Sequence, residues 1–308
     1  MTRVTRRPPP ISLVVRRYTW CFDDVHDRDW LLGSAALSRW FDVYTLLVPD
    51  NEAFYIRTLT PCLQWEDVEV EKLELLNFFR QESLHGIAHK AYWKRMSELG
   101  IEFQPFLKTV NWILYSIFEP TQSHRMKFAI VAAIEHVNAS LGNIVLRRDL
   151  LRSTNRSLRE MFYWHFAEEI EHKAVAHNAL ARFYPGYITR ILGALVAFPS
   201  FYLVCFLGMA YFLFKEQKLF SRATLRELFK FWISDGVLRD TICHLGRYFK
   251  WSFQPWDEDD LHLTQIVECL AIYTKKSAGG NFAERAEAVA IEAGLDTGHR
   301  SDAKQKHR

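Results

Sequence analysis

Two segments of the sequence each place a glutamate three residues before a histidine, and this repeated spacing constrains the fold most. One pair is Glu82-x-x-His85, within NFFRQESLHGIAHKAYW, and the other is Glu169-x-x-His172, within FYWHFAEEIEHKAVAH. Residues three or four apart lie on one face of an α-helix. Two such pairs on separate helices can face a common centre, which predicts a bundle of helices rather than a sheet.

Apolar residues recur at helical spacing along most of the chain, and strand signals are few. A turn expected at 49–51 separates the first two helices, and a short helix is expected at 282–294. The sequence therefore predicts an all-α fold, a ferritin-like four-helix di-metal bundle with additional N- and C-terminal helices. The expected helices before residue 275 cover 35–47, a segment from 52 onward, 68–99, 104–118, 123–150, 158–183 and 191–214, followed by two or three more.

The composition indicates one large helical domain between two polar ends. We expect a basic, proline-rich arm at 1–18, a single helical domain at 19–275 and a flexible polar tail at 276–308. A net charge of +3 among 308 residues is too balanced to indicate nucleic-acid binding. The five cysteines show no C-x-x-C spacing, so disulfides are not expected and a cytoplasmic location fits best.

Further ionisable residues extend the face defined by the two pairs. His165 lies one turn before Glu169, so His165, Glu169 and His172 form one stripe at i, i+4 and i+7. A ferritin-like site also takes one carboxylate from each of two other helices. Glu52, at an expected helix start, and Glu135, in a helix of small apolar residues, can supply these carboxylates.

Metal ions would make such a buried set of acids tolerable. Burying four carboxylates without cations costs many kcal/mol or forces them to take up protons. Carboxylates favour hard ions such as iron or manganese, imidazoles suit iron, and zinc is a further option. We expect two iron ions (Fe2+/Fe3+) held by Glu52, Glu82, His85, Glu135, His165, Glu169 and His172.

Several neighbouring residues have roles that the spacing leaves open. His165 is either a third imidazole ligand or a residue that orients a ligand carboxylate. His89, one turn after His85, and Glu168, next to the stripe, are the candidate catalytic residues and would carry protons. Glu171 points away from the stripe, so we expect it to face solvent or to form an ion pair.

Three further histidines fall outside the metal-facing positions. His136 follows Glu135 directly and lies about 100° around the helix from it, so we expect it to hydrogen-bond elsewhere. His124 and His177 carry no pattern and are expected to be ordinary surface histidines.

These motifs resemble a bacterial family described as predicted metal-dependent hydrolases, over roughly residues 10–275. The resemblance rests on RQESLHGIAH at 80–89, AAIEH at 132–136 and WHFAEEIEHKAVA at 164–176. The family has a glycine before the first ligand glutamate, where this chain has Asn51, a residue that tolerates similar backbone angles. The His-x-x-x-Glu-x-x-His string is also similar to the ligand helix of di-iron arylamine N-oxygenases.

Two enzyme classes fit the expected site. A carboxylate-rich bundle favours a non-haem di-iron oxidoreductase, an oxygenase or oxidase that uses dioxygen or peroxide and an electron donor on a lipid-like or amine substrate. The alternative is a metal-dependent hydrolase at the same residues, with Glu168 or His89 as proton carrier. Iron storage is disfavoured because the extra helices and the apolar segment do not suit a ferritin-like cage.

The segment ILGALVAFPSFYLVCFLGMAYFLF at 191–214 has no charged residue and is long enough to cross a bilayer. It predicts either a membrane contact at the inner face of the membrane or a helix buried in the protein or in a homodimer interface. Basic residues flank both ends and set no orientation. A hairpin broken at Pro199 would keep both flanks on the cytoplasmic side.

Overall fold

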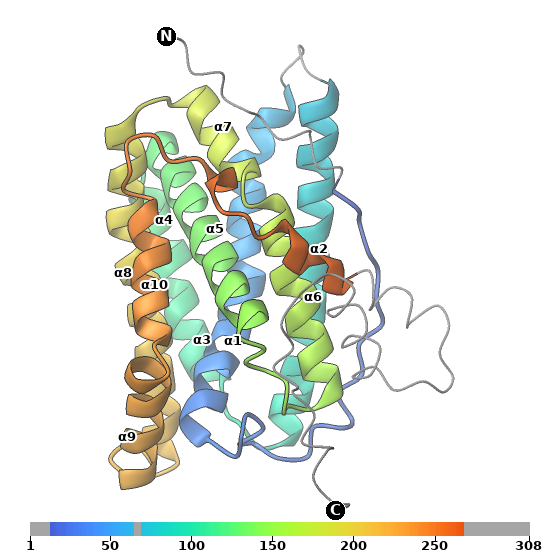
Figure 1. Cartoon of the computed structure of the whole chain (residues 1–308), viewed down its shortest axis with the longest axis vertical. Coiled ribbons are helices and arrows are strands. Elements are labelled where there is room, and N and C mark those ends of the chain that lie inside the picture. Colours follow the sequence, from blue (N-terminus) through green and yellow to red (C-terminus); the bar gives the residue numbers. More distant parts are fainter. Residues whose placement is uncertain (1–12, 65–68, 268–308) are drawn as a thin grey trace, which may run out of the picture.

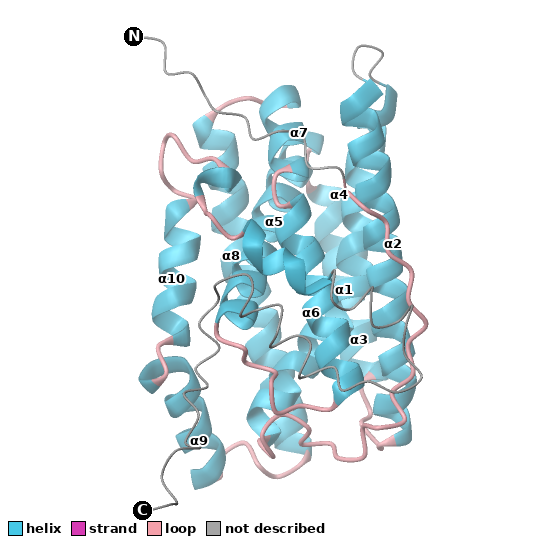
Figure 2. Ribbon diagram, turned by 45° about the vertical axis from the view of Figure 1, so that its right-hand side comes forward, coloured by secondary structure: helices cyan, strands magenta, loops and turns pink. Residues whose placement is uncertain are grey.

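The computed structural model describes residues 13–64 and 69–267, and every regular element in these ranges is a helix (Figures 1 and 2). The all-α class predicted from the sequence is therefore confirmed. The ferritin-like arrangement of four of the helices stays a prediction. The helix expected at 282–294 and the tail at 276–308 lie outside the described residues, as do residues 1–12 of the arm.

Four long helices run side by side and form the centre of the molecule (Figure 1). They are α1 (Ala35–Leu59), α2 (Glu69–Glu98), α5 (His124–Arg147) and α6 (Arg156–His172). Helix α2 agrees with the expected 68–99 helix and is followed by Gly100, whose φ of 75° suits the left-handed turn that ends many helices. Ser34 and Ser123 cap the starts of α1 and α5 through their hydroxyl groups.

The remaining helices surround this centre. They are the short 3-10 segment η1 (Thr60–Gln64), α3 (Gln104–Asn111), the π-helical η2 (Trp112–Phe118), α4 (Glu119–Thr121), α7 (Val175–Phe183), α8 (Tyr187–Lys215), α9 (Arg222–Phe229), the π-helical η3 (Lys230–Ser234), α10 (Val237–Arg247), and the 3-10 turns η4 (Pro255–Asp257) and η5 (Leu261–Thr264). Helices α8, α9 and α10 lie together on one side of the bundle (Figure 1). Residues 187–247 thus cover one flank of the centre.

Small residues allow α8 and α6 to approach α5 very closely. A Cβ atom added to Gly193 of α8 would lie 2.4 Å from the backbone of Ala129 in α5, nearer than any real contact. A Cβ atom on Gly142 of α5 would lie 2.7 Å from the carbonyl oxygen of Phe166 in α6. Backbone-to-backbone packing of this kind fixes the positions of α5 and α6, which both carry residues of the predicted site.

Helix α1 corrects the expected turn at 49–51, because it continues through Pro49 as far as Leu59. Proline removes one helical hydrogen bond, to the carbonyl of the residue four positions earlier. That carbonyl belongs to Thr45, and it accepts a hydrogen bond from the indole of Trp93 on α2 at 3.2 Å. The lost bond is therefore replaced from a neighbouring helix.

Two other expected helices are divided in the structure. The helix expected at 158–183 ends at His172 and resumes at Val175, and the one expected at 104–118 changes from α3 to the π-helical η2 at Trp112. The helical stretch also continues beyond residue 118 into α4, which contains Pro120 in its first turn. Helix α8 includes the whole apolar segment 191–214 and runs through Pro199, which rules out a hairpin there.

Candidate metal centre

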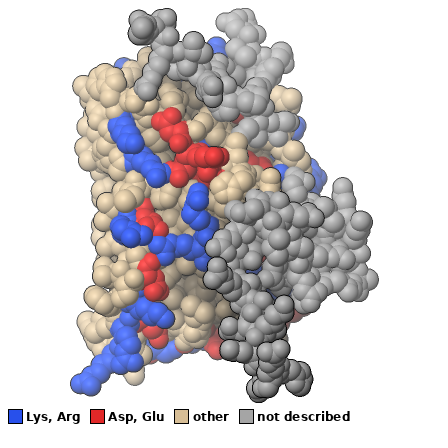
Figure 3. Space-filling view, viewed as in Figure 1, with Lys and Arg blue, Asp and Glu red and all other residues tan. Residues whose placement is uncertain are grey.

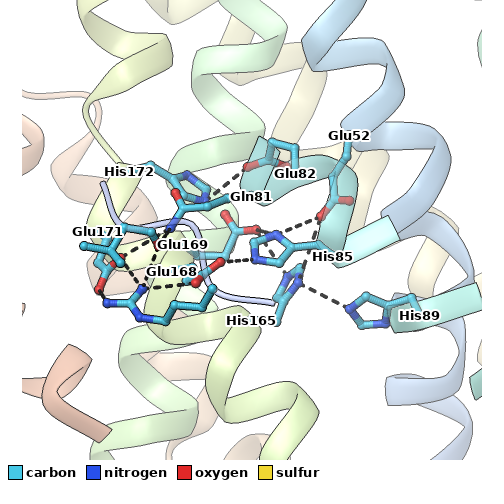
Figure 4. A network of polar contacts seen from close by, with 12 residues as sticks. Glu52, Gln81, Glu82, His85, His89, His165, Glu168, Glu169, Glu171 and His172 are labelled. Carbon is cyan, nitrogen blue, oxygen red and sulfur yellow. Dashed lines mark hydrogen bonds and ion pairs between the residues drawn. The ribbon is translucent and has the colours of Figure 1, made fainter. Parts of the chain in front are cut away.

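The structure brings all seven predicted metal ligands to the inside of the four-helix centre, and Figure 4 labels all of them except Glu135. Glu52 comes from α1, the Glu82 pair from α2, Glu135 from α5, and the three-residue stripe from α6. Every one of the seven side chains is 2% exposed or less. At this level of the bundle, each of the four helices therefore directs these polar residues inward.

Within the described residues, two groups of four side chains are arranged closely enough to hold a metal ion. In each group one potential ligand atom from every member lies within 4.8 Å of the others. The first group consists of Glu52, His85, His165 and Glu169, and the second of Glu82, His85, Glu169 and His172. His85 and Glu169 belong to both groups, so the two candidate sites adjoin each other. Their role as ligands stays a prediction.

Buried polar atoms without hydrogen-bond partners test whether metal ions fit these groups. A buried polar atom without a partner costs about 1–3 kcal/mol, so native proteins rarely leave several together. In the described part of the chain, such atoms include both carboxylate oxygens of Glu52, Glu82 and Glu169, one oxygen of Glu135, Nδ1 of His85 and Nε2 of His172. Oxygen and imidazole nitrogen atoms are suitable ligands for iron, manganese or zinc, so the donor set fits two such ions.

Burial also shifts the proton affinities of these groups. Desolvation raises the pKa of Glu52, Glu82 and Glu169 well above the ordinary value, and the neighbouring carboxylates raise it further. Desolvation likewise lowers the pKa of His85 and His165 well below the ordinary value. Nearby cations would favour the ionised carboxylates and leave the imidazoles neutral, which is the protonation state that metal ligation requires.

His85 is shared by the two groups, and Glu168 and Trp164 contact its ring. Its Nδ1 atom is 3.2 Å from Oε1 of Glu52, and its Nε2 atom is 3.0 Å from Oε2 of Glu168. The edge of the Trp164 ring packs against the imidazole, with ring centroids 4.7 Å apart. Glu168 belongs to neither four-residue group, so the structure places it next to a predicted ligand rather than among the ligands.

Glu168 is in turn held by the N-terminal arm. Arg16 donates to Oε1 of Glu168 at 3.0 Å and to Oε1 of Glu171 at 2.9 Å. Burial raises the pKa of Glu168 to about 7 although Arg16 opposes the shift. Of the two expectations for Glu171, the ion pair is confirmed and solvent exposure is wrong, because the arm covers this face of α6 and leaves the residue 8% exposed.

His165 is in contact with the first group and with two residues behind it. Its Nε2 atom lies 3.2 Å from Oε1 of Glu169 and 2.7 Å from the hydroxyl of Tyr44 on α1. Its Nδ1 atom lies 3.3 Å from Nε2 of His89. His89 belongs to neither group, and its nearest site contact is this histidine, so the structure places His89 behind His165.

His172 connects the second group to α5. Its Nε2 atom is 3.1 Å from Oε1 of Glu82, without hydrogen-bond geometry, and its Nδ1 atom is 3.0 Å from Oε2 of Glu135. The ring of Phe78 packs edge-on against this imidazole. Glu135 therefore lies at the margin of the centre and outside both four-residue groups, while its other oxygen atom has no partner in the described structure.

The remaining histidines give one correction. His136 hydrogen-bonds to the carbonyl of His244 at 3.0 Å, away from the centre, and His124 is exposed, both as expected. The expectation that His177 lies on the surface is wrong. Helix α7 turns it towards the ring of Phe253, and the side chain is 7% exposed.

Three residues next to the centre have no signal in the sequence. Arg16 lies in an arm without periodicity, and it meets Glu168 only because the arm runs along α6. Tyr44 and Trp164 are aromatic residues on buried helices, a position that normally indicates core packing. Their contacts with His165 and His85 depend on how helices pack, which the spacing along one helix does not report.

Two clefts lie near Glu52, and one of them is lined by this residue. One is narrow, offers no space for a water molecule, and is lined by Glu52, Asn51 and Tyr44 among others. The second is open, has a volume of about 780 Å³, and is lined by Tyr115, Asn111 and Arg57 among others. The hydroxyl of Tyr115 donates to Oδ1 of Asn51 at 2.6 Å, so this hydrogen bond joins the wall of one cleft to the wall of the other.

Comparison with protein families shows to which family this chain belongs. Residues 14–259 match the model of a family described as "Predicted metal-dependent hydrolase". The chain belongs to this family. The match spans every residue of the two four-residue groups, and Arg16 and Glu168 as well. No curated protein and no solved structure matches the chain.

Membership of the predicted metal-dependent hydrolases agrees with the buried donor set. The family description indicates an enzyme that depends on a metal ion, and the structure contains two adjoining groups that could hold such ions. The description does not specify which metal is bound. The di-iron assignment therefore stays a prediction, as do manganese and zinc.

Proposed function

We propose that this chain is a metal-dependent hydrolase whose catalytic centre is a pair of adjoining metal sites. The observation that carries the proposal is the pair of buried four-residue groups that share His85 and Glu169. A shared carboxylate is the usual means of holding two ions a few ångströms apart. Bound metal ions would polarise an ester or phosphoester substrate and activate water for attack on it.

The chain's own residues fix the orientation of the ligands. Glu168 accepts a hydrogen bond from Nε2 of His85, which keeps the proton on that nitrogen and leaves Nδ1 free to face Glu52. Arg16 holds Glu168 in place from the other side. His89 makes the corresponding contact with Nδ1 of His165. In this proposal Glu168 and His89 are positioning residues as well as the candidate proton carriers.

Substrate would enter from the open cleft on the surface. The cleft of about 780 Å³ is large enough for a small molecule and contains basic and aromatic side chains. The narrow cleft next to Glu52 begins where Tyr115 meets Asn51. A passage from the open cleft to Glu52 would require the Tyr115–Asn51 hydrogen bond to break.

A di-iron oxidoreductase is the second candidate, and the composition of the centre favours it. Four glutamates and three histidines are all buried, and carboxylate-rich sites of this kind in helical bundles commonly hold two irons. Hydrolytic centres more often keep an open coordination position that water reaches directly. The two candidates differ in one observable respect, since only the oxidoreductase consumes dioxygen or peroxide together with electrons.

Metal analysis of single variants tests the proposed centre. We expect two metal ions per chain in protein purified without added metal, about one in Glu52→Ala or Glu82→Ala, and less than one in Glu169→Ala. Glu52 and Glu82 each belong to one group, whereas Glu169 belongs to both and offers two carboxylate oxygens. His124→Ala, at an exposed position on α5, is the matched control and should keep both ions. Absence of bound metal in the wild-type protein contradicts both candidates.

Activity measurements then separate the candidates. We expect hydrolysis of ester or phosphoester substrates under anaerobic conditions, restored to the metal-free protein by iron, manganese or zinc. Oxygen consumption by the chemically reduced protein, with no anaerobic hydrolysis, would replace the hydrolase with the oxidoreductase. His85→Ala should abolish whichever activity is present, and His124→Ala should keep it.

A further inference from the structure

Helix α8 has an apolar outward face. Two described helices are long and apolar enough to cross a membrane, α5 and α8, but 89% of the relevant stretch is buried in α5 and only 39% in α8. A helix on the surface of a soluble protein normally carries polar residues on its outer side. The outer side of α8 instead exposes Ile188, Leu192, Leu195, Leu203, Phe206, Leu207 and Phe214.

The apolar face continues onto the two following helices. Phe206 of α8 packs against Trp232 of η3, with ring centroids 5.3 Å apart. In Figure 3 the outermost left-hand rim, which α8, α9 and α10 form in this view, is tan, and blue Lys and Arg side chains lie next to it and reach the edge at its lower end. Further exposed apolar residues on these helices are Leu225, Phe229, Ile233, Leu238 and Ile242.

Basic residues are interleaved with the apolar residues at the α9 end. Arg222, Arg226 and Lys230 follow one another at intervals of four and therefore share one side of the helix. None of the three has an ion-pair partner within residues 13–64 and 69–267. They are thus available to an anionic partner.

Three acids of the same region are engaged within the protein, whereas Asp235, between η3 and α10, is exposed. Glu227 of α9 accepts a hydrogen bond from the hydroxyl of Ser34 at 2.6 Å. Glu216, just after α8, accepts from the guanidinium of Arg39 at 2.7 Å. Asp240 of α10 pairs with Arg148. The charge that this region presents outward is therefore mainly positive.

We propose that the face formed by α8, α9 and α10 docks on a lipid bilayer that contains anionic headgroups, with α9 lying in the plane of the headgroups. An amphipathic helix with basic residues beside its apolar side is typical of this mode of binding. Trp251, which is 79% exposed directly after α10, suits the boundary between headgroups and acyl chains. The bilayer would cover the outward side of α8.

Charge decides between a bilayer and a second copy of the chain. In a two-fold symmetric dimer the same face meets itself, so Arg222, Arg226 and Lys230 would meet a surface on which Asp235 is the one exposed acid without a side-chain partner among the described residues. Anionic headgroups supply the missing negative charge, at about a fivefold gain in binding for each basic residue near the surface. The apolar area and the basic residues therefore act together only on a membrane.

Vesicle flotation with the full-length, metal-loaded protein tests the proposal. We expect flotation with phosphatidylcholine vesicles that contain phosphatidylglycerol, much less with phosphatidylcholine alone, and a loss at high salt. The triple variant Arg222→Gln, Arg226→Gln, Lys230→Gln should bind about a hundredfold more weakly, because three cations are lost. Because these three residues are exposed, replacing them should not unfold the protein, so weaker binding would report the loss of charge.

The apolar part is tested with Leu203→Ser/Leu207→Ser, which should bind at least about tenfold more weakly. Leu73→Ser on α2, at a leucine of similar exposure, is the control and should bind like the wild type. Two results would overturn the proposal. One is absence of binding to anionic vesicles, and the other is a dimer, measured by light scattering, that the Leu203/Leu207 variant converts to a monomer.

Discussion

At the scale of single residues, burial sets the proton affinity of histidines well away from the metal centre. His177 is enclosed between α7 and the ring of Phe253, and its Nδ1 atom has no hydrogen-bond partner in the described structure. Burial, assisted by the charge of Arg190, lowers its pKa from the ordinary value of 6.5 to about 4. Folding therefore keeps this imidazole neutral over a range in which the unfolded chain takes up a proton.

The sign of the resulting pH dependence is definite. Between about pH 6.5 and pH 4 the unfolded state binds one more proton at this position, so stability falls as the pH falls. The unfolding free energy of the wild type should fall between pH 7 and pH 5, and in His177→Gln this fall should be smaller by about 2 kcal/mol. Urea denaturation at the two pH values measures it, with His124→Gln, at the exposed start of α5, as the control. An unchanged difference in His177→Gln would contradict the assignment.

At the scale of elements, α1 is continuous only because α2 replaces the bond that Pro49 removes. Trp93 donates to the carbonyl of Thr45, which no longer has its helical partner. The helix carries Glu52 one turn after the proline, so this indole also keeps the direction of a predicted ligand. A turn at 49–51 would have placed Glu52 on a different axis.

A double-mutant cycle tests this contact. Trp93→Phe leaves the Thr45 carbonyl without a partner and should lower the free energy of unfolding by about 1–2 kcal/mol. In a Pro49→Ala background, the new N–H of residue 49 can bond to that carbonyl, so the same change should cost about 1 kcal/mol less. Equal costs in the two backgrounds, measured by urea denaturation, would show that the replacement does not occur.

The close approach of α8 to α5 gives a second prediction for an element. In Gly193→Ala the new Cβ would meet the backbone of Ala129, which cannot move without shifting a helix, so we expect a loss of at least about 3 kcal/mol in unfolding free energy. Gly246→Ala is the control, because nothing lies within 4 Å of its added Cβ and alanine favours the helix. Thermal denaturation of both variants measures the difference, and similar melting temperatures would contradict the packing.

The helix bounds show which parts of the fold a sequence can reveal. The E-x-x-H spacing predicted which faces of α2 and α6 turn to the centre, because residues three or four apart share one face of a helix. Glu52 was expected at a helix start and lies instead within α1. The continuity of α1 depended on a donor from α2, and the break after His172 on the packing of α7. Arg16 and Tyr44 likewise reach the centre through tertiary contacts. Contacts between two elements leave no periodic pattern in the sequence, so the sequence alone does not predict them.

At the scale of the whole molecule, the buried acids connect stability to metal content. Four glutamates with raised pKa values lie inside one hydrophobic core, and cations are the partners that make such a core favourable. A ligand that binds only the folded state stabilises it by about 4 kcal/mol at a thousandfold excess over its dissociation constant. The stability of the folded protein and its metal content should therefore be measured on the same samples.

We expect a chelator to lower the melting temperature by several degrees, and added metal to restore it. For a chain of this size about 1 kcal/mol corresponds to roughly 2–4 °C. Glu52→Ala/Glu82→Ala, which removes one carboxylate from each group, is the comparison and should respond much less to chelation. The same melting temperature with and without chelator in the wild type would show that the buried acids are stable without cations.

The contact between Arg16 and Glu168 has a consequence for the order of events during synthesis. The two residues are 152 positions apart, so at 5–20 residues per second the ribosome makes them roughly 8–30 seconds apart. Glu52 and Glu82 are likewise made well before Glu169 exists. The nascent chain must keep its early acids in water until α6 emerges, so binding of metal ions at the predicted ligands would belong to a late stage of folding, when Arg16 can reach Glu168.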